Sequence, residues 1–229
     1  MLNAVIFDFD GIIVNSEPVH YRAYQEIFVP LGFGFSWEEY VSRYIGLDDR
    51  EIFRKVFSAN DNGLDNEELE QLMSRKATAF RYMAGSGIKP YPGVAELIRA
   101  LSGNLPLALC SGAVRSDISP ILERLDLSIA FDAIVTADDV AVSKPDPESY
   151  RLALRKLSSA YPDREILPGS CLAIEDTPAG IASAKAAGMA VLAVTNSHPA
   201  ERLSNAGFIL DSLVQVTVDY LKGNVIPLS

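Results

Sequence analysis

Two carboxylates interrupt an apolar run near the start of the chain. Asp8 and Asp10 lie inside VIFDFDGIIV, residues 5–14. Burying an ionised carboxylate without partners costs several kcal/mol, so both acids need a compensating cation, strong hydrogen-bond donors or access to solvent. The partners must come from elsewhere in the chain.

Other polar residues follow apolar runs in the same way. Ser111 and Gly112 follow PLALC, Lys144 lies in the loop after AIVTADDVAV, and Glu175 with Asp176 ends CLAIE. In open α/β sheets, ligands bind outside the carboxyl ends of the strands. We therefore expect these residues to meet Asp8 and Asp10 at one edge of a sheet.

The charges of this group predict a divalent cation. If Asp8, Glu175 and Asp176 are ionised, Asp10 is protonated and Lys144 is charged, three negative charges and one positive charge sum to −2. Such a site would repel an anionic substrate. Mg²⁺ prefers oxygen ligands and commonly binds through carboxylates together with a phosphate oxygen, so it is the expected cofactor.

The elements that must position these residues form an α/β pattern. Short apolar runs alternate with helical segments from residue 88 onward, which indicates right-handed βαβ units and a parallel, Rossmann-like sheet with helices on both faces. AVIFDF at residues 4–9 is a further buried strand. The other expected strands are 106–110, 133–137, 171–175 and 190–195, and the expected helices are 115–127, 147–160, 178–188 and 199–207.

A different pattern separates the first strand from the rest. Within residues 16–87, apolar residues recur at three- and four-residue spacing, with no convincing strand between them. We predict an inserted helical domain at 16–87 and an α/β core built from 1–15 and 88–229.

Composition restricts the partners. Twenty Lys and Arg against 30 Asp and Glu give a net charge of −10, which argues against nucleic acid or an anionic membrane as the main partner. The first strand starts too early for a signal peptide, and no apolar run could span a bilayer, so we expect a cytoplasmic protein. Cys110 and Cys171 lie in apolar runs and suggest neither a disulfide framework nor a zinc site. A monomer or weak homodimer is expected.

The order of the motifs DFDG, SG, KPDP and IEDTPAG resembles the haloacid dehalogenase superfamily, in its phosphatase and β-phosphoglucomutase-like branch with a helical cap. The resemblance spans nearly the whole chain. It implies that Asp8 attacks phosphorus to form an aspartyl-phosphate, that Asp10 is the general acid and base, and that Mg²⁺ bridges the carboxylates and the phosphoryl group. The metal ligands expected on this basis are Asp8, Asp10, Glu175 and Asp176.

The same resemblance extends to substrate binding. Ser111 matches a hydroxyl that binds a phosphoryl oxygen, assisted by backbone N–H groups of the turn it opens, and Lys144 would keep Asp8 ionised. Gly11 and Gly112, inside the DFDG and SG motifs, are expected beside the substrate. The simpler alternatives are a turn role for Ser111, a solvated loop position for Lys144 and a capping role for Glu175 and Asp176.

In the helical domain, His20 and Lys76 fall where β-phosphoglucomutases have a histidine and a lysine. Two departures weaken the likeness to a mutase. Asp49 stands where the mutases have a phosphate-binding arginine, with Arg50 one place later, and Ala113 and Arg115 replace a serine and an asparagine that help to hold the second phosphate. Arg50 and Arg115 remain candidates for binding an anion by another route.

We therefore expect a Mg²⁺-dependent phosphatase that hydrolyses a small phosphomonoester such as a sugar phosphate or a phosphoglycolate-like compound. The alternative is a β-phosphoglucomutase-type hexose-phosphate mutase. A 2-haloacid dehalogenase is disfavoured because that branch lacks the second acid, here Asp10, and needs no metal. A catalytically inactive scaffold is the non-enzymatic alternative.

Overall fold

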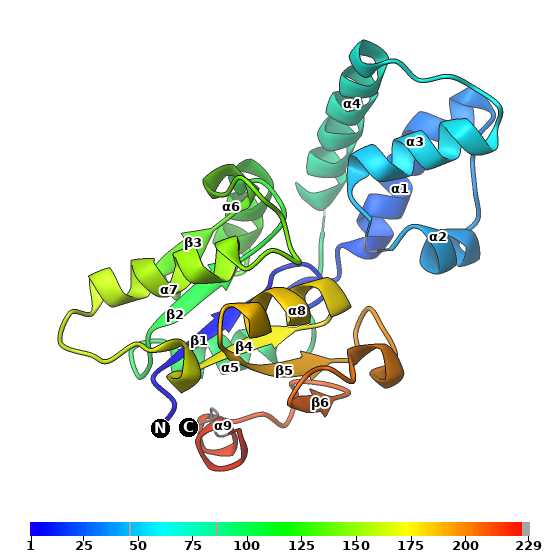
Figure 1. Ribbon diagram of the computed structural model, residues 1–229. Coiled ribbons are helices and arrows are strands. Elements are labelled where there is room, and N and C mark those ends of the chain that lie inside the picture. The colour runs from blue at the N-terminus through cyan, green and yellow to red at the C-terminus, as the bar shows by residue number, and fades with distance from the viewer. Residues whose placement is uncertain (46, 86, 226–229) are drawn as a thin grey trace. The chain divides into compact units, whose positions relative to one another are not determined.

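The computed structural model describes residues 1–45, 47–85 and 87–225 (Figure 1). The chain divides into two compact units: Met1–Asn15 with Lys89–Ser229, and Ser16–Ile88. We call the first the α/β unit and the second the helical unit. No helix among the described residues combines the length and apolar character needed to cross a membrane.

The α/β unit is built on a six-stranded sheet in the order β3-β2-β1-β4-β5-β6, with every neighbouring pair parallel. This order puts the first strand of the chain in the middle, between β2 and β4, which lie more than 60 residues apart in sequence. The expected parallel α/β sheet is confirmed. The strands are β1 (Ala4–Phe7), β2 (Leu107–Cys110), β3 (Ala133–Val135), β4 (Cys171–Glu175), β5 (Ala190–Val194) and β6 (Phe208–Leu210).

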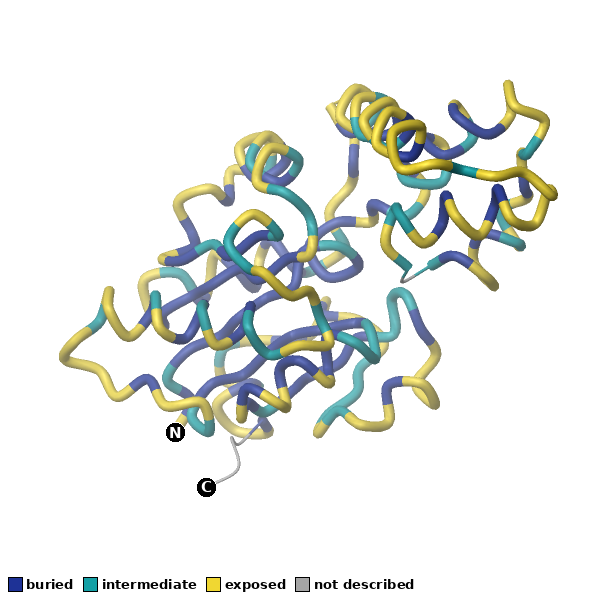
Figure 2. Tube along the Cα trace, turned by 45° about the horizontal axis from the view of Figure 1, so that its top comes forward, coloured by how far each residue is buried: buried dark blue, intermediate teal, exposed yellow. Residues whose placement is uncertain are grey.

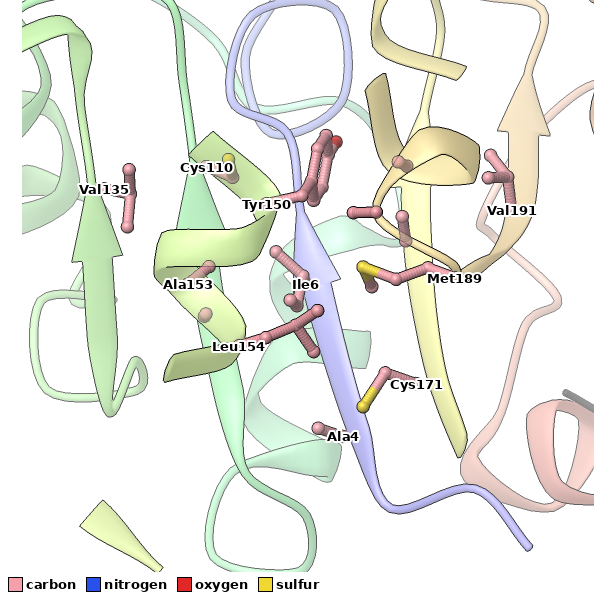
Figure 3. Packing of buried hydrophobic residues seen from close by; sticks show 14 of the residues in the cluster. Ala4, Ile6, Cys110, Val135, Tyr150, Ala153, Leu154, Cys171, Met189 and Val191 are labelled. Carbon is pink, nitrogen blue, oxygen red and sulfur yellow. The ribbon is translucent and has the colours of Figure 1, made fainter. Parts of the chain in front are cut away.

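Helices cover both faces of the sheet. Successive residues of a strand point to opposite faces, and the residues that point to each face are buried. On one face, Ile6, Cys110 and Ala173 pack with Tyr150 and Leu154 in a single apolar cluster (Figure 3). On the other face, Val5, Phe7 and Leu109 are equally buried. The helices of this unit are α5 (Val94–Leu101), α6 (Arg115–Arg124), α7 (Glu148–Ala160), α8 (Pro178–Ala186) and α9 (Val218–Asn224).

One expectation for the end of the chain is wrong, and one strand was missed. Residues 199–207 form only the short 3₁₀ helix η4 (Ala200–Leu203) instead of a full helix, and Leu203 is its one buried residue. The edge strand β6 was not predicted. Its apolar run, FIL, is only three residues long, which is shorter than the roughly four to eight residues that indicate a strand, and all three residues are half-buried.

The helical unit contains α1 (Glu17–Phe28), α2 (Trp37–Arg43), α3 (Asp49–Ala59) and α4 (Asn66–Gly85), and its described residues include no strand. Side-chain caps fix three of the helix starts: Ser36 accepts a hydrogen bond from the Glu39 N–H, Asp48 from the Glu51 N–H and Asp65 from the Glu68 N–H. Figure 2 shows buried segments in both units. The core of the helical unit is aromatic, with Tyr24, Phe28 and Phe53 fully buried.

Candidate active site

A tight loop follows β1 and carries the first two acids. The Gly11 N–H donates to the Val14 carbonyl, and the Ile13 and Val14 N–H groups both donate to the Phe9 carbonyl. The loop therefore turns sharply at Asp10 and Gly11. Gly11 has φ +83°, and a Cβ atom there would lie 1.8 Å from an Asp176 carboxyl oxygen. Only glycine satisfies both the left-handed backbone and the close approach of Asp176.

Lys144 joins the first acid to the end of β4. Its ammonium donates to Asp8 Oδ1 at 2.6 Å, to Glu175 Oε1 at 2.7 Å and to the Cys110 carbonyl at 3.0 Å. These bonds use all three N–H donors of the ammonium. Three strands thus converge on one lysine at the carboxyl end of the sheet, where the sequence predicts a site.

Glu175 is a fully buried acid whose two oxygens are both hydrogen-bonded. Oε1 also accepts from the Tyr150 hydroxyl at 2.8 Å. Oε2 accepts from the Asp176 N–H, the Thr177 N–H and the Thr177 hydroxyl at 3.2 to 3.4 Å. Thr177 in turn caps α8 by accepting from the Gly180 N–H at 3.0 Å. Capping and site roles, which the sequence could not separate, coexist in this turn.

Asp176 has the opposite surroundings. It is fully buried, and neither carboxyl oxygen has a hydrogen-bond partner. Asp8, Glu175 and Asp176 each offer a carboxylate oxygen within 4.8 Å of the others. A buried carboxylate without donors is costly unless a cation binds it, and carboxylate oxygens suit a hard divalent ion. The cluster is therefore one that could hold a metal ion.

The electrostatics of the cluster follow from its burial. Burial raises the pKa of Asp8 to about 7, and the charges of Glu175 and Asp10 add to the rise while Lys144 opposes it. Burial, together with the charges of Asp8 and Glu175, raises the pKa of Asp176 well above its usual value. For Lys144, burial acts to lower the pKa, but the charges of Asp8 and Glu175 outweigh burial and raise it. A cation would stabilise the ionised form of both aspartates.

Ser111 directly follows β2 and is buried. Its N–H donates to the Val135 carbonyl, and its hydroxyl oxygen accepts from the Ala113 N–H at 3.0 Å. The turn role is therefore present, and the hydroxyl proton remains available to an acceptor such as a phosphoryl oxygen. Gly112 is exposed, and a Cβ atom there would meet nothing within 4 Å.

The candidate residues of the helical unit form their own polar cluster. Lys76, almost fully buried, lies 2.9 Å from His20 Nδ1 and donates to Asp49 Oδ1 at 2.7 Å. The Tyr24 hydroxyl donates to the same Asp49 oxygen at 2.5 Å. Burial, and then the Lys76 charge, lower the pKa of His20 well below its usual value, so the imidazole is neutral and accepts from Lys76. Arg50 lies outside this cluster and pairs with Glu70.

Arg115, at the start of α6, lies beside the edge strand β3. Its guanidinium donates to Asp139 Oδ2 at 2.9 Å and to the Ile134 carbonyl at 3.1 Å. It makes no hydrogen bond or ion pair to the acidic cluster within the described residues. A role for Arg115 in substrate binding stays a prediction.

Sequence reasoning missed two residues that support the site. Tyr150 holds Glu175, and its ring lies 5.0 Å from the Lys144 ammonium. Asn196, after β5, donates from its amide to the Gly11 carbonyl at 2.7 Å and so ties down the loop that carries Asp10. Tyr150 looked like one more apolar residue of a helix, and Asn196 like a loop residue. Asn196 could have been predicted from its position: it follows the end of an expected strand, as the other predicted site residues do.

The sequence model of the Haloacid dehalogenase-like hydrolase family matches residues 5–194, which include the helical unit, most of the α/β unit and every acid of the cluster. The chain belongs to this family. The expected resemblance to this superfamily is confirmed. The phosphorylated carbohydrates phosphatase of Thermotoga maritima is similar to this chain. The two sequences are 30% identical over 189 residues, which cover 82% of each chain.

Two further proteins resemble this haloacid dehalogenase-like hydrolase along most of their length. Protein CbbY of Rhodobacter capsulatus is 32% identical over 204 residues, covering 86% of this chain and 87% of the relative. The crystal structure of a β-phosphoglucomutase from Clostridium difficile superimposes with a TM-score of 0.79 at 25% identity, covering 97% of this chain and 96% of that chain. Both a phosphatase and a mutase are therefore among the proteins that this chain resembles.

Proposed function

We propose that this chain is a Mg²⁺-dependent phosphatase that hydrolyses a small phosphorylated carbohydrate through an aspartyl-phosphate on Asp8. The observation that carries the proposal is the position of Asp8. Lys144 holds one of its oxygens, and Asp176, with two unpartnered oxygens, lies beside it. A nucleophilic carboxylate, a fixed cation and the ligands for a metal are together what phosphoryl transfer requires.

In the proposed reaction, an Asp8 carboxylate oxygen attacks phosphorus and the bond to the leaving alkoxide breaks. Asp10 donates a proton to that alkoxide. Asp10 then takes a proton from water, and the resulting hydroxide attacks phosphorus, which releases inorganic phosphate and restores Asp8. The Lys144 ammonium keeps Asp8 ionised during attack, and the Ser111 hydroxyl donates to a phosphoryl oxygen.

Asp8 and Asp176 are the acids best placed to hold Mg²⁺, with Asp10 and Glu175 as the further predicted ligands. Asp176 supports this assignment because both its oxygens lack donors, whereas Glu175 has donors at each oxygen. When bound, Mg²⁺ supplies charge neutralisation for the phosphoryl group.

The substrate class rests on the relatives. The similar Thermotoga maritima protein is named a phosphorylated carbohydrates phosphatase. We propose a small phosphorylated sugar for this chain, with the helical unit Ser16–Ile88 as the cap that selects the leaving group. A cytoplasmic location belongs to the same proposal, since both cysteines are free and buried.

A mutase is the second candidate, because the Clostridium difficile structure is a β-phosphoglucomutase. A mutase must also hold a second phosphate. Of the two cations that the sequence offered for that task, Arg50 pairs with Glu70, and Arg115 lies at the β3 edge without a hydrogen bond or ion pair to the acidic cluster among the described residues. These positions favour the phosphatase.

The test is hydrolysis of p-nitrophenyl phosphate and of a panel of sugar phosphates by the purified protein. We expect turnover with Mg²⁺, none after EDTA, and loss of turnover in Asp8→Asn with the circular dichroism spectrum unchanged. Normal turnover in Asp8→Asn would refute the nucleophile. Conversion of glucose 1-phosphate to glucose 6-phosphate without release of phosphate would identify a mutase instead.

A further inference from the structure

A cavity of ≈ 490 Å³ lies in the α/β unit at the edge of the sheet, and it is separate from the acidic cluster. β3 is one of the two edge strands of the sheet, the other being β6 (Figure 1). The lining shares no residue with the acidic cluster, with Ser111 or with the helical unit. Its residues are Arg115, Asp132, Ala133, Ile134, Arg155, Lys156 and Ser159.

The acids at this cavity are already hydrogen-bonded at both oxygens. Asp132 accepts from the Leu107 N–H at 2.8 Å and from the Tyr161 hydroxyl at 2.6 Å. Asp139, behind the lining, accepts from Arg115, Lys156 and Thr136. Partial burial acts to raise the pKa of Asp139, but hydrogen bonds from Thr136 and Lys156 outweigh it and lower the pKa to about 2. Asp139 is therefore a fixed anion that orients two cations.

The donors, by contrast, are not used up. Arg155 makes no hydrogen bond or ion pair within the described parts of the chain. Arg115 uses one of its two terminal nitrogens, and Lys156 bonds only the Ile134 carbonyl and Asp139. Ser159 lies one helical turn after Arg155 on α7 and adds a hydroxyl. The groups left free are a guanidinium, parts of two other cations and a hydroxyl.

A cavity whose unused hydrogen-bonding groups are mostly N–H donors on cationic side chains is complementary to an oxyanion. Arginine presents a planar fork that matches two oxygens of a phosphate group, and two arginines and a lysine offer positive charge to more than one phosphate. The lining itself carries three cations and one acid, Asp132, in a chain of net charge −10, while Asp138 and Asp139 lie behind it and bond to Arg115. From these observations we infer that this β3-edge cavity binds a small phosphate-bearing anion, at a site distinct from the catalytic one.

The test is a titration of uniformly ¹⁵N-labelled protein with inorganic pyrophosphate at pH 8 in EDTA, followed by amide chemical shifts. Without metal, the acidic cluster repels the anion, so binding reports the β3-edge cavity whether or not the proposed function is correct. We expect saturable shifts at residues 132–134 and 155–159. Sodium chloride at equal ionic strength should not reproduce them.

Arg155→Ala should weaken pyrophosphate binding roughly tenfold, because it removes a charge-assisted, two-pronged contact from an exposed position. Arg151→Ala is the matched control. Arg151 lies one turn earlier on α7, donates to the Ala186 carbonyl and is outside the lining, so its loss should leave the affinity within about twofold. The inference is overturned by absence of saturable binding, by shifts centred on Asp8 and Ser111, or by unchanged affinity in Arg155→Ala.

Discussion

Tyr150 donates a hydrogen bond of 2.8 Å to Glu175 Oε1, the same oxygen that accepts from Lys144 at 2.7 Å. Burial, and then the Glu175 charge, raise the pKa of Tyr150 well above its usual value, so the phenol remains a donor at every working pH. Tyr150 thus helps to hold Glu175 in place, and Glu175 in turn holds Lys144 beside Asp8. It acts as a positioning residue and has no contact with the reacting atoms of the proposed reaction.

Removing that hydroxyl should therefore impair turnover more than stability. Tyr150→Phe keeps the ring in the core and lets Glu175 and Lys144 shift. Loss of a partner of this kind typically costs tenfold or more, so we expect kcat to fall roughly tenfold with KM nearly unchanged. Steady-state kinetics on p-nitrophenyl phosphate measure both constants, and thermal unfolding checks the fold.

Tyr161→Phe is the control for that experiment. Tyr161 directly follows the end of the same helix and donates to an Asp132 oxygen at 2.6 Å, and Asp132 does not belong to the acidic cluster. It therefore loses an equivalent tyrosine–carboxylate bond outside the site. A fall in kcat of equal size in both variants, or a loss of stability without any change of kcat in Tyr150→Phe, would reduce Tyr150 to a structural residue.

Gly180→Ala should destabilise the protein although the position is helical. In an ordinary helix this change stabilises by roughly 0.5–1 kcal/mol. Here the new Cβ atom would lie 1.9 to 2.1 Å from the Glu175 carboxylate. Glu175 or the start of α8 must move, and overpacking of this kind costs about 1–3 kcal/mol. Urea denaturation monitored by circular dichroism measures the free energy of unfolding.

Gly223→Ala in α9 is the matched control, because a Cβ atom there meets nothing within 4 Å. It should be neutral or stabilising by up to about 1 kcal/mol. Gly180→Ala should lower the phosphatase activity of the folded protein as well, since Glu175 holds Lys144. Equal stabilisation by both alanines would show that Glu175 does not occupy the space above Gly180.

Binding of Mg²⁺ at pH 7 should release protons. With its pKa raised to about 7, Asp8 is partly protonated at this pH in the metal-free protein. A cation binds only the ionised carboxylate, so the affinity for Mg²⁺ should increase as the pH rises through 7 and level off above it. Isothermal titration calorimetry in two buffers of different ionisation enthalpy counts the protons released. Asp8→Asn should release fewer, and an affinity independent of pH between 6 and 8 would contradict the assignment.

The same raised pKa affects stability without metal. A carboxyl whose folded pKa lies above its unfolded value of 3.8 binds more protons when folded, so its contribution to stability is lost as the pH rises toward 7. Asp8→Asn removes this buried charge. In EDTA at pH 8 it should unfold at a temperature several degrees higher than the parent protein, whereas at low pH the two should be similar.

Asp49→Asn should destabilise the helical unit by about 2–4 kcal/mol, because it leaves the buried Lys76 ammonium without its carboxylate. The neutral imidazole of His20 and the rings of Tyr24 and Phe80 would be its remaining neighbours. Adding Lys76→Met removes the unpaired charge and should restore most of the loss. Chemical denaturation of the two single variants and the double variant forms the cycle. Additive losses would show that Asp49 and Lys76 are not coupled.

The sequence by itself determined the α/β sheet, the inserted helical segments and the acids at the strand ends. It could do so because burial on both faces makes each inner strand a continuous apolar run, so a polar or charged residue at its end stands out: Asp8, Ser111 and Glu175 were all found this way. It also marked His20 and Lys76, but through resemblance alone. The Asp49–Lys76 pair joins residues 27 positions apart and could not be read from spacing.

Only the tertiary structure decided how the acids differ from one another. Glu175 and Asp176 are adjacent in sequence. Glu175 accepts hydrogen bonds from Tyr150, Lys144 and Thr177, whereas neither buried oxygen of Asp176 has a hydrogen-bond partner. Both acids end the same apolar run, so the sequence pattern does not distinguish them. The difference arises from the donors that the fold brings to each carboxylate oxygen. Arg115 is a similar case, because a guanidinium at the end of a long side chain can reach either the substrate loop or the sheet edge, and Asp139 holds it at the edge.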